Sequence, residues 1–268
     1  MNESYVIAGG AAGRDRLRLL SEVMEPHTRD LIERAGVQPG ARCLDVGCGG
    51  GEVSYLLAAT VGDSGQVVSV DLDEAQLEIV RKEAQQQGMR NVTFECRDVT
   101  SWEPETAFDF IYMRFILTHL PDPAGFLMSV CRHLRPGGMA LAEDIDFRGH
   151  LSEPDCPALS RSVDLYTASV RKRGADPNIG PRLPGLLRGA GLTDVGINLF
   201  HPARMEPGGI KELVALTAQR TAETAVGDGL ATKEEMQKTV AELFEFARNP
   251  ETLIAGPRIF QAWGSAPS

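Results

Sequence analysis

Four glycines follow an apolar run near residue 45 and are the clearest sign of a ligand site in the sequence. The run is Leu44-Asp45-Val46-Gly47-Cys48-Gly49-Gly50-Gly51, and a helical pattern follows it. Glycine lets the backbone turn tightly and lets a ligand approach the main chain where the strands of an α/β sheet end. The same glycines are compatible with a flexible turn that holds no ligand, so a second residue is needed to decide.

Asp71 is that second residue. It lies twenty residues after Gly51, at the end of the next expected strand, where a carboxylate can accept hydrogen bonds from both hydroxyls of a ribose. The alternative role is to cap the following helix, but Asp73 is better placed for this because Gln76 follows it at capping-box spacing. The glycines and Asp71 together therefore favour a ligand that contains adenosine.

Glu52 restricts the kind of adenosine ligand. The dinucleotide fingerprint G-x-G-x-x-G/A, started at Gly47, requires glycine or alanine where Glu52 stands. A carboxylate in the first turn of the helix would repel a pyrophosphate bound at the helix N-terminus. We therefore expect a ligand without phosphates, and this residue disfavours the alternative of an NAD(P)-dependent oxidoreductase.

Alternating strands and helices must position these residues. The pattern repeats about every thirty residues, which is typical of a parallel sheet covered by helices on both faces. The expected strands are 41–46, 66–72, 92–97, 108–113, 139–145, 193–200 and 253–263, the last interrupted by Gly256-Pro257. The expected helices are one or two over 14–35, then 52–60, 73–87, 122–135, 159–173, a short one ending near 189, 210–224 and 232–248.

The regular alternation stops after Phe147, which suggests how the chain is organised. We expect an N-terminal helical lid segment over 1–35 and a ligand-binding core over 36–147. A helical cap insertion is expected over 148–190. The segment 191–268 should contain the final strands of the sheet, with a helical insertion at about 204–252.

The composition is that of an ordinary globular protein. The 268 residues carry 27 Lys and Arg against 37 Asp and Glu, a net charge of −10, and 43% are hydrophobic. No apolar stretch reaches the ~20 residues of a membrane span, and the acidic charge disfavours bulk nucleic-acid binding. The five cysteines show no C-x-x-C spacing and are expected as thiols packed like small hydrophobes, and the N-terminus lacks a secretory pattern, so a cytoplasmic protein is expected.

Taken in order along 36–147, the motifs resemble those of the class I S-adenosylmethionine (SAM)-dependent methyltransferases, specifically the small-molecule group that includes the ubiquinone/menaquinone type. They are Asp45-x-Gly47-x-Gly49-x-Gly51, Asp71, Arg97-Asp98-Val99, Phe108-Asp109-Phe110-Ile111-Tyr112, Leu117-Thr118-His119-Leu120-Pro121-Asp122 and Leu134-Arg135-Pro136-Gly137-Gly138. The resemblance implies an α/β fold with a Rossmann-like, doubly wound sheet of seven strands, mostly parallel with the last strand antiparallel, and here with helical cap insertions. It also implies transfer of a methyl group from SAM to a small-molecule acceptor, with release of S-adenosylhomocysteine (SAH).

The resemblance further implies which residues hold the methionine portion of the cofactor. Gly47, with its neighbours Cys48 and Gly49, would face this portion, and Asp45 would lie near its ammonium group. The backbone around Arg114 would complete the floor of the site.

A second group of residues is implied for the nucleoside portion. Asp71 would hold the ribose, and Asp98 would accept a hydrogen bond from the adenine amino group beside the backbone of Val99. Leu72 and Gln76 would flank the adenine ring. The alternative for Asp98 is a purely structural role as a turn residue.

Candidate residues for the chemistry lie near the ends of later strands. Methyl transfer mainly requires a dry cavity that holds donor and acceptor together, and a base only if the acceptor arrives protonated. His119 is the candidate base or hydrogen-bonding group, unless it only fixes the loop before Pro121. Asp144 and Asp146 share a face of their strand and would orient an acceptor or hold Mg²⁺. The alternative is a solvated strand end. The sequence offers no third metal ligand, so no metal is expected.

Further expectations concern the N-terminus and the mode of action. Tyr5 would lie near the sulfonium or the substrate if its segment folds over the cofactor as in related enzymes, unless that segment is a disordered tail. A catalytically silent SAM-binding protein that acts through its cap is a further alternative. Neither the acceptor nor the oligomeric state follows from the sequence, and a homodimer is left open.

Overall fold

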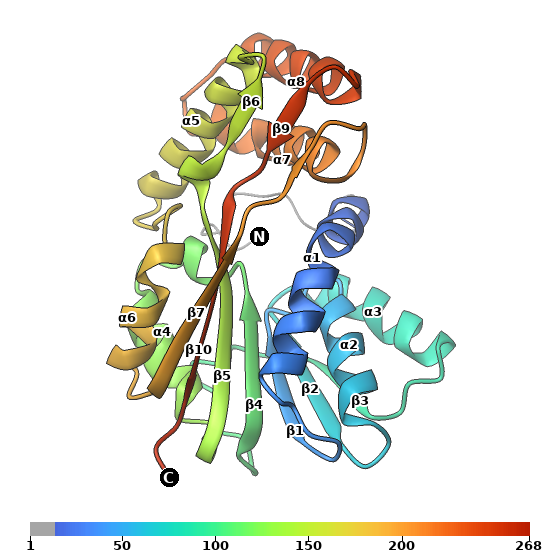
Figure 1. Ribbon diagram of the computed structural model, residues 1–268, viewed down its shortest axis with the longest axis vertical. Helices are drawn as coiled ribbons and strands as arrows, with labels where there is room; N and C mark the ends of the chain where they lie inside the picture. The colour runs from blue at the N-terminus through green and yellow to red at the C-terminus, as the bar shows by residue number, and fades with distance from the viewer. Residues whose placement is uncertain (1–13) are drawn as a thin grey trace.

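A seven-stranded sheet forms the centre of the protein in the computed structural model, which describes residues 14–268 (Figure 1). The strand order is β3-β2-β1-β4-β5-β10-β7. Strands β1 to β5 are parallel to one another, and β10 is antiparallel to both of its neighbours. The predicted doubly wound, Rossmann-like sheet with an antiparallel last strand is confirmed. Its strands are β1 (Arg42–Val46), β2 (Gln66–Asp71), β3 (Val92–Cys96), β4 (Phe108–Arg114), β5 (Leu134–Asp146), β7 (Thr193–Phe200) and β10 (Arg258–Ser265).

The central strands are buried on both faces, which explains their continuous apolar sequences. Leu44 and Ile111 pack on one face of the sheet, while Cys43 and Tyr112 pack on the other. All four side chains are inaccessible to solvent. The sequence could therefore place these strands from apolar runs alone.

Helices cover both faces of the sheet (Figure 1). α1, α2 and α3 lie on one face, and α4 and α6 lie on the other. Leu183 and Leu187 of α6 are fully buried against the sheet, so this part of 148–190 packs with the core. Among residues 14–268, no helix is long and apolar enough to cross a membrane. The five helices are α1 (Arg14–Arg34), α2 (Glu52–Val61), α3 (Glu74–Gln86), α4 (Pro123–Cys131) and α6 (Leu183–Gly189).

A cap lies beyond the carboxyl edge of the sheet (Figure 1). It contains α5 (Pro157–Lys172), α7 (Gly209–Gly227) and α8 (Lys233–Arg248). It also holds a small antiparallel sheet of order β6-β9-β8, which the sequence analysis did not predict. The expected strand over 253–263 is divided at Gly256-Pro257 between two sheets, with β9 in the cap and β10 in the core. The strands of the small sheet are β6 (Leu151–Glu153), β8 (Ala203–Arg204) and β9 (Leu253–Ala255).

The buried ammonium group of Lys211 joins the two helices of the later insertion. Its Nζ atom donates to the carbonyl oxygens of Met205, Asn249 and Thr252, each at 2.7 Å, and the side chain is inaccessible to solvent. A buried charge is tolerated when its donors are satisfied in this way. Lys211 therefore ties the start of α7 to the chain that leaves α8.

Candidate functional site

The site predicted from the sequence lies where the winding of the sheet reverses. β1 has β2 on one side and β4 on the other, so the crevice between the carboxyl ends of β1 and β4 is the switch point of the sheet. Open α/β sheets bind their ligands outside the carboxyl ends of the strands at this point. The residues described below lie at the ends of β1 to β5 or in the segments that directly follow them.

The glycine-rich turn adopts a conformation that other residues disfavour. Gly47, Gly49 and Gly51 have φ values of 64°, 49° and 80°. The backbone N–H groups of Gly47 and Cys48 donate to the carbonyl oxygen of Val70 at 2.8 and 3.1 Å, which fixes the turn to β2. A Cβ atom on Gly47 would lie 2.7 Å from Cδ1 of Ile116. The turn therefore requires glycine both for its backbone and for close packing.

Asp71 holds the glycine turn and the end of β2 together. Its carboxylate accepts from the backbone N–H of Gly49 at 2.9 Å, of Leu72 at 2.7 Å and of Asp73 at 3.0 Å. The carboxylate thus lies at the glycine turn, where three backbone donors hold it. The Leu72 side chain beside it is 57% exposed and leaves an apolar surface at this edge.

Gln76 is buried without hydrogen bonds to its side chain. Asp73 caps α3 by accepting from the Gln76 backbone N–H at 3.1 Å, as predicted. The reciprocal half of a capping box is not formed. The Gln76 side chain is only 3% exposed, and neither Oε1 nor Nε2 has a partner within residues 14–268. Buried amides are normally paired, so this carboxamide is an exception among the described residues.

Asp98 and Val99, which follow β3, differ in their environment. The Asp98 carboxylate is exposed and accepts from Thr100, at 2.9 Å from the backbone N–H and 2.6 Å from the hydroxyl. Asp98 therefore has the role of a turn residue, although its second carboxylate oxygen accepts no hydrogen bond from the described residues. Val99 is 5% exposed and packs in the main core.

Asp45 and Arg114 lie on the same face of neighbouring strands. The Asp45 carboxylate is 2% exposed and accepts from the Ser54 hydroxyl at 2.6 Å. Burial raises the pKa of Asp45 to about 7, against the lowering effects of Ser54 and Arg114. Arg114 ends β4 and pairs in register with Glu143 of β5. A cation and a carboxyl group thus flank the switch point.

Glu143 is a buried carboxylate that the sequence analysis did not single out. It is 1% exposed and accepts hydrogen bonds from Thr28 at 2.9 Å, from the Tyr112 hydroxyl and from the Gln261 amide. Thr28 belongs to α1, so this carboxylate fixes the N-terminal helix to the sheet. A glutamate inside an apolar strand sequence was the available signal, since buried carboxylates need partners.

His119 lies in the short 3-10 helix η2 (Leu117–His119), directly after β4. The side chain is 6% exposed. Burial, and to a smaller extent the nearby charge of Arg16, lowers the pKa of His119 to about 3. The imidazole is therefore neutral at physiological pH. Arg16 in turn donates to the Thr217 hydroxyl of α7 at 3.1 Å, which places the cap beside this loop.

Asp144 is a structural support for the loop that carries His119. Its carboxylate accepts from the backbone N–H of Thr118 at 3.1 Å and of Ile145 at 2.8 Å. The side chain is 1% exposed, and burial raises the pKa of Asp144 to about 7. The alternative of a solvated strand end is therefore wrong, because the carboxyl group lies inside the protein.

Asp146 is fully buried as well, and arginines neutralise it. Arg148 and Arg258 each approach its carboxylate to 2.7 Å. Across residues 14–268, no group of three His, Cys, Asp or Glu side chains is arranged to hold a metal ion.

Two other expectations concern the cysteines and Tyr5. Four of the cysteines are buried as predicted, but Cys96 is exposed at the end of β3. That expectation was wrong for Cys96 because β3 is the outermost strand of the sheet and has no neighbour on one side. Tyr5 lies outside the described residues.

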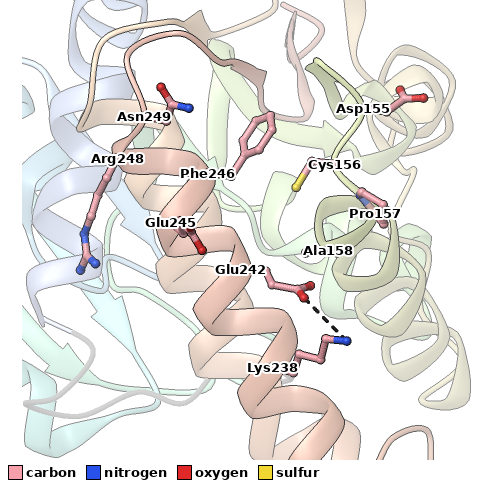
Figure 2. Close-up of a pocket in the computed structure, with 10 residues that line it drawn as sticks. All are labelled: Asp155, Cys156, Pro157, Ala158, Lys238, Glu242, Glu245, Phe246, Arg248 and Asn249. Atoms are coloured by element: carbon pink, nitrogen blue, oxygen red, sulfur yellow. Dashed lines mark ion pairs between the residues drawn. The ribbon is translucent and has the colours of Figure 1, made fainter.

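An open groove lies on the cap (Figure 2). It has a volume of about 740 Å³ and is formed by the start of α5 and by α8. Figure 2 shows Lys238 and Glu242 of α8 paired along one side, at 3.8 Å, with Phe246 further along the same helix. None of the residues at the strand ends lines it, so the groove is not part of the candidate site.

The family of the protein follows from comparison with known sequences. Residues 38–178 match the family described as methyltransferase domain, and this is more than half of the chain. The chain therefore belongs to that family, which confirms the family resemblance.

Curated relatives share the same region. The ubiquinone/menaquinone biosynthesis C-methyltransferase UbiE of Teredinibacter turnerae is 34% identical over 141 residues, which are 52% of this chain and 54% of the relative. Methyltransferase GfsG of Streptomyces halstedii is 32% identical over 170 residues, covering 59% of this chain and 60% of the relative. The chain thus spans about half to three fifths of the length of these relatives.

A solved structure shares the fold over more of the chain. Phosphoethanolamine N-methyltransferase 2 of Haemonchus contortus, in complex with phosphomonomethylethanolamine and S-adenosylhomocysteine, has a TM-score of 0.54. The likeness covers 95% of this chain and 52% of that protein, at 15% sequence identity. It shows the Rossmann-like fold.

Proposed function

We propose that the protein transfers a methyl group from SAM to a small-molecule acceptor and releases SAH. The observation that carries this proposal is the glycine turn held to the Asp71 carboxylate at the switch point of the sheet. Membership of the methyltransferase domain family supports it, and so does the fold shared with a methyltransferase solved with SAH. Because the curated relatives are covered only in part, the acceptor is left as a small molecule.

The residues at the strand ends fit a sulfonium nucleoside. Asp71 would accept from the ribose hydroxyls, and the unpartnered carboxamide of Gln76 would bind a polar atom of the nucleoside. Leu72 would cover the adenine with its exposed side chain. Asp98 would accept from the adenine amino group with its remaining oxygen, beside the backbone of Val99.

At the other end, the backbone of Gly47, Cys48 and Gly49 would contact the methionine portion, and Asp45 would face its ammonium group. Glu52 begins α2 directly after Gly51, and its carboxylate disfavours the pyrophosphate that an NAD(P) ligand would place there.

The bound cofactor would supply a methyl group attached to a positively charged sulfur. When the acceptor attacks the methyl carbon in line, the sulfur would leave as a neutral thioether. The protein contributes positioning and exclusion of water. His119 is neutral, and a pKa of about 3 makes its imidazole a weak base. We propose that His119 orients the acceptor by hydrogen bonding, and that Asp144 acts indirectly by holding the η2 loop.

The setting of the reaction is proposed as the cytoplasm. All five cysteines are free, as is usual for proteins kept in a reducing compartment.

Calorimetric titration with SAM, SAH and NADH tests the cofactor. We expect SAM and SAH to bind and NADH not to bind. Asp71→Ala should weaken SAM binding by about 1–3 kcal/mol, because hydrogen bonds to a charged acceptor are lost. Asp63→Ala is the matched control, since Asp63 is exposed in the turn that precedes β2. Equal affinity of the Asp71→Ala variant and the wild type would refute the ribose assignment.

Transfer of a labelled methyl group to a panel of small molecules separates an enzyme from a silent SAM-binding protein. If SAM binds and no acceptor is methylated in a broad panel, the silent alternative gains support.

A further inference from the structure

The outer edge of β7 ends the main sheet and has no strand beside it. β7 is the last strand in the order of the sheet, and among residues 14–268 only β10 pairs with it. An edge strand presents backbone N–H and C=O groups that lack ladder partners, and such a row is a template for a further strand. The free edge of β7 is therefore a place where another chain can extend the sheet.

This edge lacks most of the features that prevent edge-to-edge pairing in natural proteins. Short strands, lysine, proline and bulges usually serve this purpose. β7 has eight residues, none of them lysine or proline, and Asp194 is its only charged residue. Its pairing with β10 shifts register between Thr193 and Gly196, so the irregularity is confined to the start of the strand. Residues 196–200 form a regular edge without these protective features.

The regular part of β7 carries a strip of exposed apolar side chains. Ile197 and Leu199 are 47% and 46% exposed. They lie opposite Ala262 and Phe260 of β10, on the face of the sheet that α4 and α6 cover. Nearly half of each side chain remains exposed, so these helices leave the outer side of β7 uncovered. The edge thus offers both backbone hydrogen-bonding groups and an apolar surface.

We propose that two copies of this chain associate through their β7 edges. The two strands pair antiparallel about a two-fold axis at Asn198, which joins the two seven-stranded sheets into one. In this register Ile197 lies opposite Leu199 of the second copy, and Leu199 lies opposite its Ile197. The four side chains form one apolar cluster on a single face of the joined sheet, and cross-strand pairs of this kind stabilise antiparallel sheets.

The charges at the two ends of the edge favour a second copy of the chain as the partner. Asp194 is exposed at the start of β7, and Arg204 is exposed just after its end. Within residues 14–268 Arg204 has one ion pair, an exposed one to Glu206 at 3.6 Å, which contributes little. Antiparallel pairing brings the start of one strand to the end of the other, so opposite charges meet at both ends. Such complementarity fixes the register and orientation of an interface.

The association leaves the candidate functional site accessible and does not depend on the proposed function. In the sheet, β5 and β10 separate β7 from β4. The carboxyl end of β7 leads into the cap, so antiparallel pairing directs the two caps to opposite ends of the dimer (Figure 1). Each copy therefore keeps its own site.

The molecular mass in solution tests the proposal. Light scattering after size-exclusion chromatography, over a series of concentrations, should give the wild type twice the mass of one chain. The double variant Ile197→Lys/Leu199→Lys places like charges opposite each other, so the dissociation constant of its dimer should rise by about 100-fold or more. Leu151→Lys, at a side chain 48% exposed on the cap, should dimerise like the wild type. A wild type that is monomeric throughout, or a double variant that dimerises equally well, would overturn the proposal.

Disulfide cross-linking decides the question if circular dichroism shows that the double variant does not fold. In a Cys96→Ser background, which removes the exposed thiol, Asn198→Cys places two sulfur atoms at the two-fold axis. Directly opposite residues of antiparallel strands have Cβ atoms about 4.5–5.5 Å apart, close to the separation that a disulfide bridges. We expect a covalent dimer under mild oxidation. Asp63→Cys, exposed before β2, is the control, and an equal yield of covalent dimer from both variants would exclude association at this edge.

Discussion

The buried carboxyl group of Asp144 is expected to make the stability of this protein depend on pH. Burial raises the pKa of Asp144 to about 7, although backbone N–H groups of Ile145 and Thr118 favour the charged form. In an unfolded chain the pKa of aspartate is about 3.9. Between these two values the folded state keeps a proton that the unfolded state has released. The contribution of Asp144 to stability is therefore largest at low pH and is lost as the pH rises towards 7.

The size of this stability change follows from the difference between the folded and unfolded pKa values of Asp144. One pKa unit corresponds to about 1.4 kcal/mol, so the contribution of Asp144 should fall by about 2 kcal/mol between about pH 5 and pH 6.5. Burial also lowers the pKa of His119 to about 3 and of His150 to about 4. Over the same pH range, these histidines make stability rise with pH, because the unfolded state binds protons that the folded state does not bind. The wild-type profile alone would hide the effect.

Comparison with Asp144→Asn isolates the carboxyl group. Urea unfolding of both proteins, followed by circular dichroism at about pH 5 and pH 6.5, gives the difference in their free energies of unfolding. We expect the stability advantage of the wild type over the variant to be about 2 kcal/mol smaller at the higher pH. The exposed Asp63→Asn should show the same stability difference at both pH values. A constant difference for Asp144→Asn would mean that the carboxyl group is ionised throughout, and that the backbone donors outweigh burial.

Two further predictions use pairs of matched positions. Gly47→Ala should destabilise the protein more than Gly62→Ala in thermal unfolding, because both have φ near 65° but only the Cβ at position 47 meets a side chain, Ile116 at 2.7 Å. Equal losses would show that Ile116 moves aside freely. Lys211→Met should cost about 3 kcal/mol or more in urea unfolding, because the buried carbonyl oxygens of Met205 and Thr252 lose their donor. The exposed Lys238→Met should cost less than about 0.5 kcal/mol. A loss below 1 kcal/mol at Lys211 would indicate that water replaces the ammonium group.

Local patterns in the sequence were sufficient for the main sheet and for the backbone of the site. The buried strands could be recognised because both of their faces are covered, which makes their sequences continuously apolar. The Asp73 cap of α3 was predictable because it depends on residues three positions apart. The glycine turn was predictable for a similar reason, since positive φ values restrict the residue type wherever the chain makes such a turn.

The tertiary structure alone decided the environment of the charged residues. Asp144 and Glu143 are adjacent in the sequence, yet one supports the η2 loop and the other binds Thr28 of α1, 115 residues away. Arg114 was expected only through its backbone, and the structure shows its side chain among carboxyl groups from three separate segments. The small sheet of the cap was likewise unpredictable, because strands of two or three residues are too short to show a pattern. In each case the contacts join segments far apart in the chain, so their energies depend on packing that no local window contains.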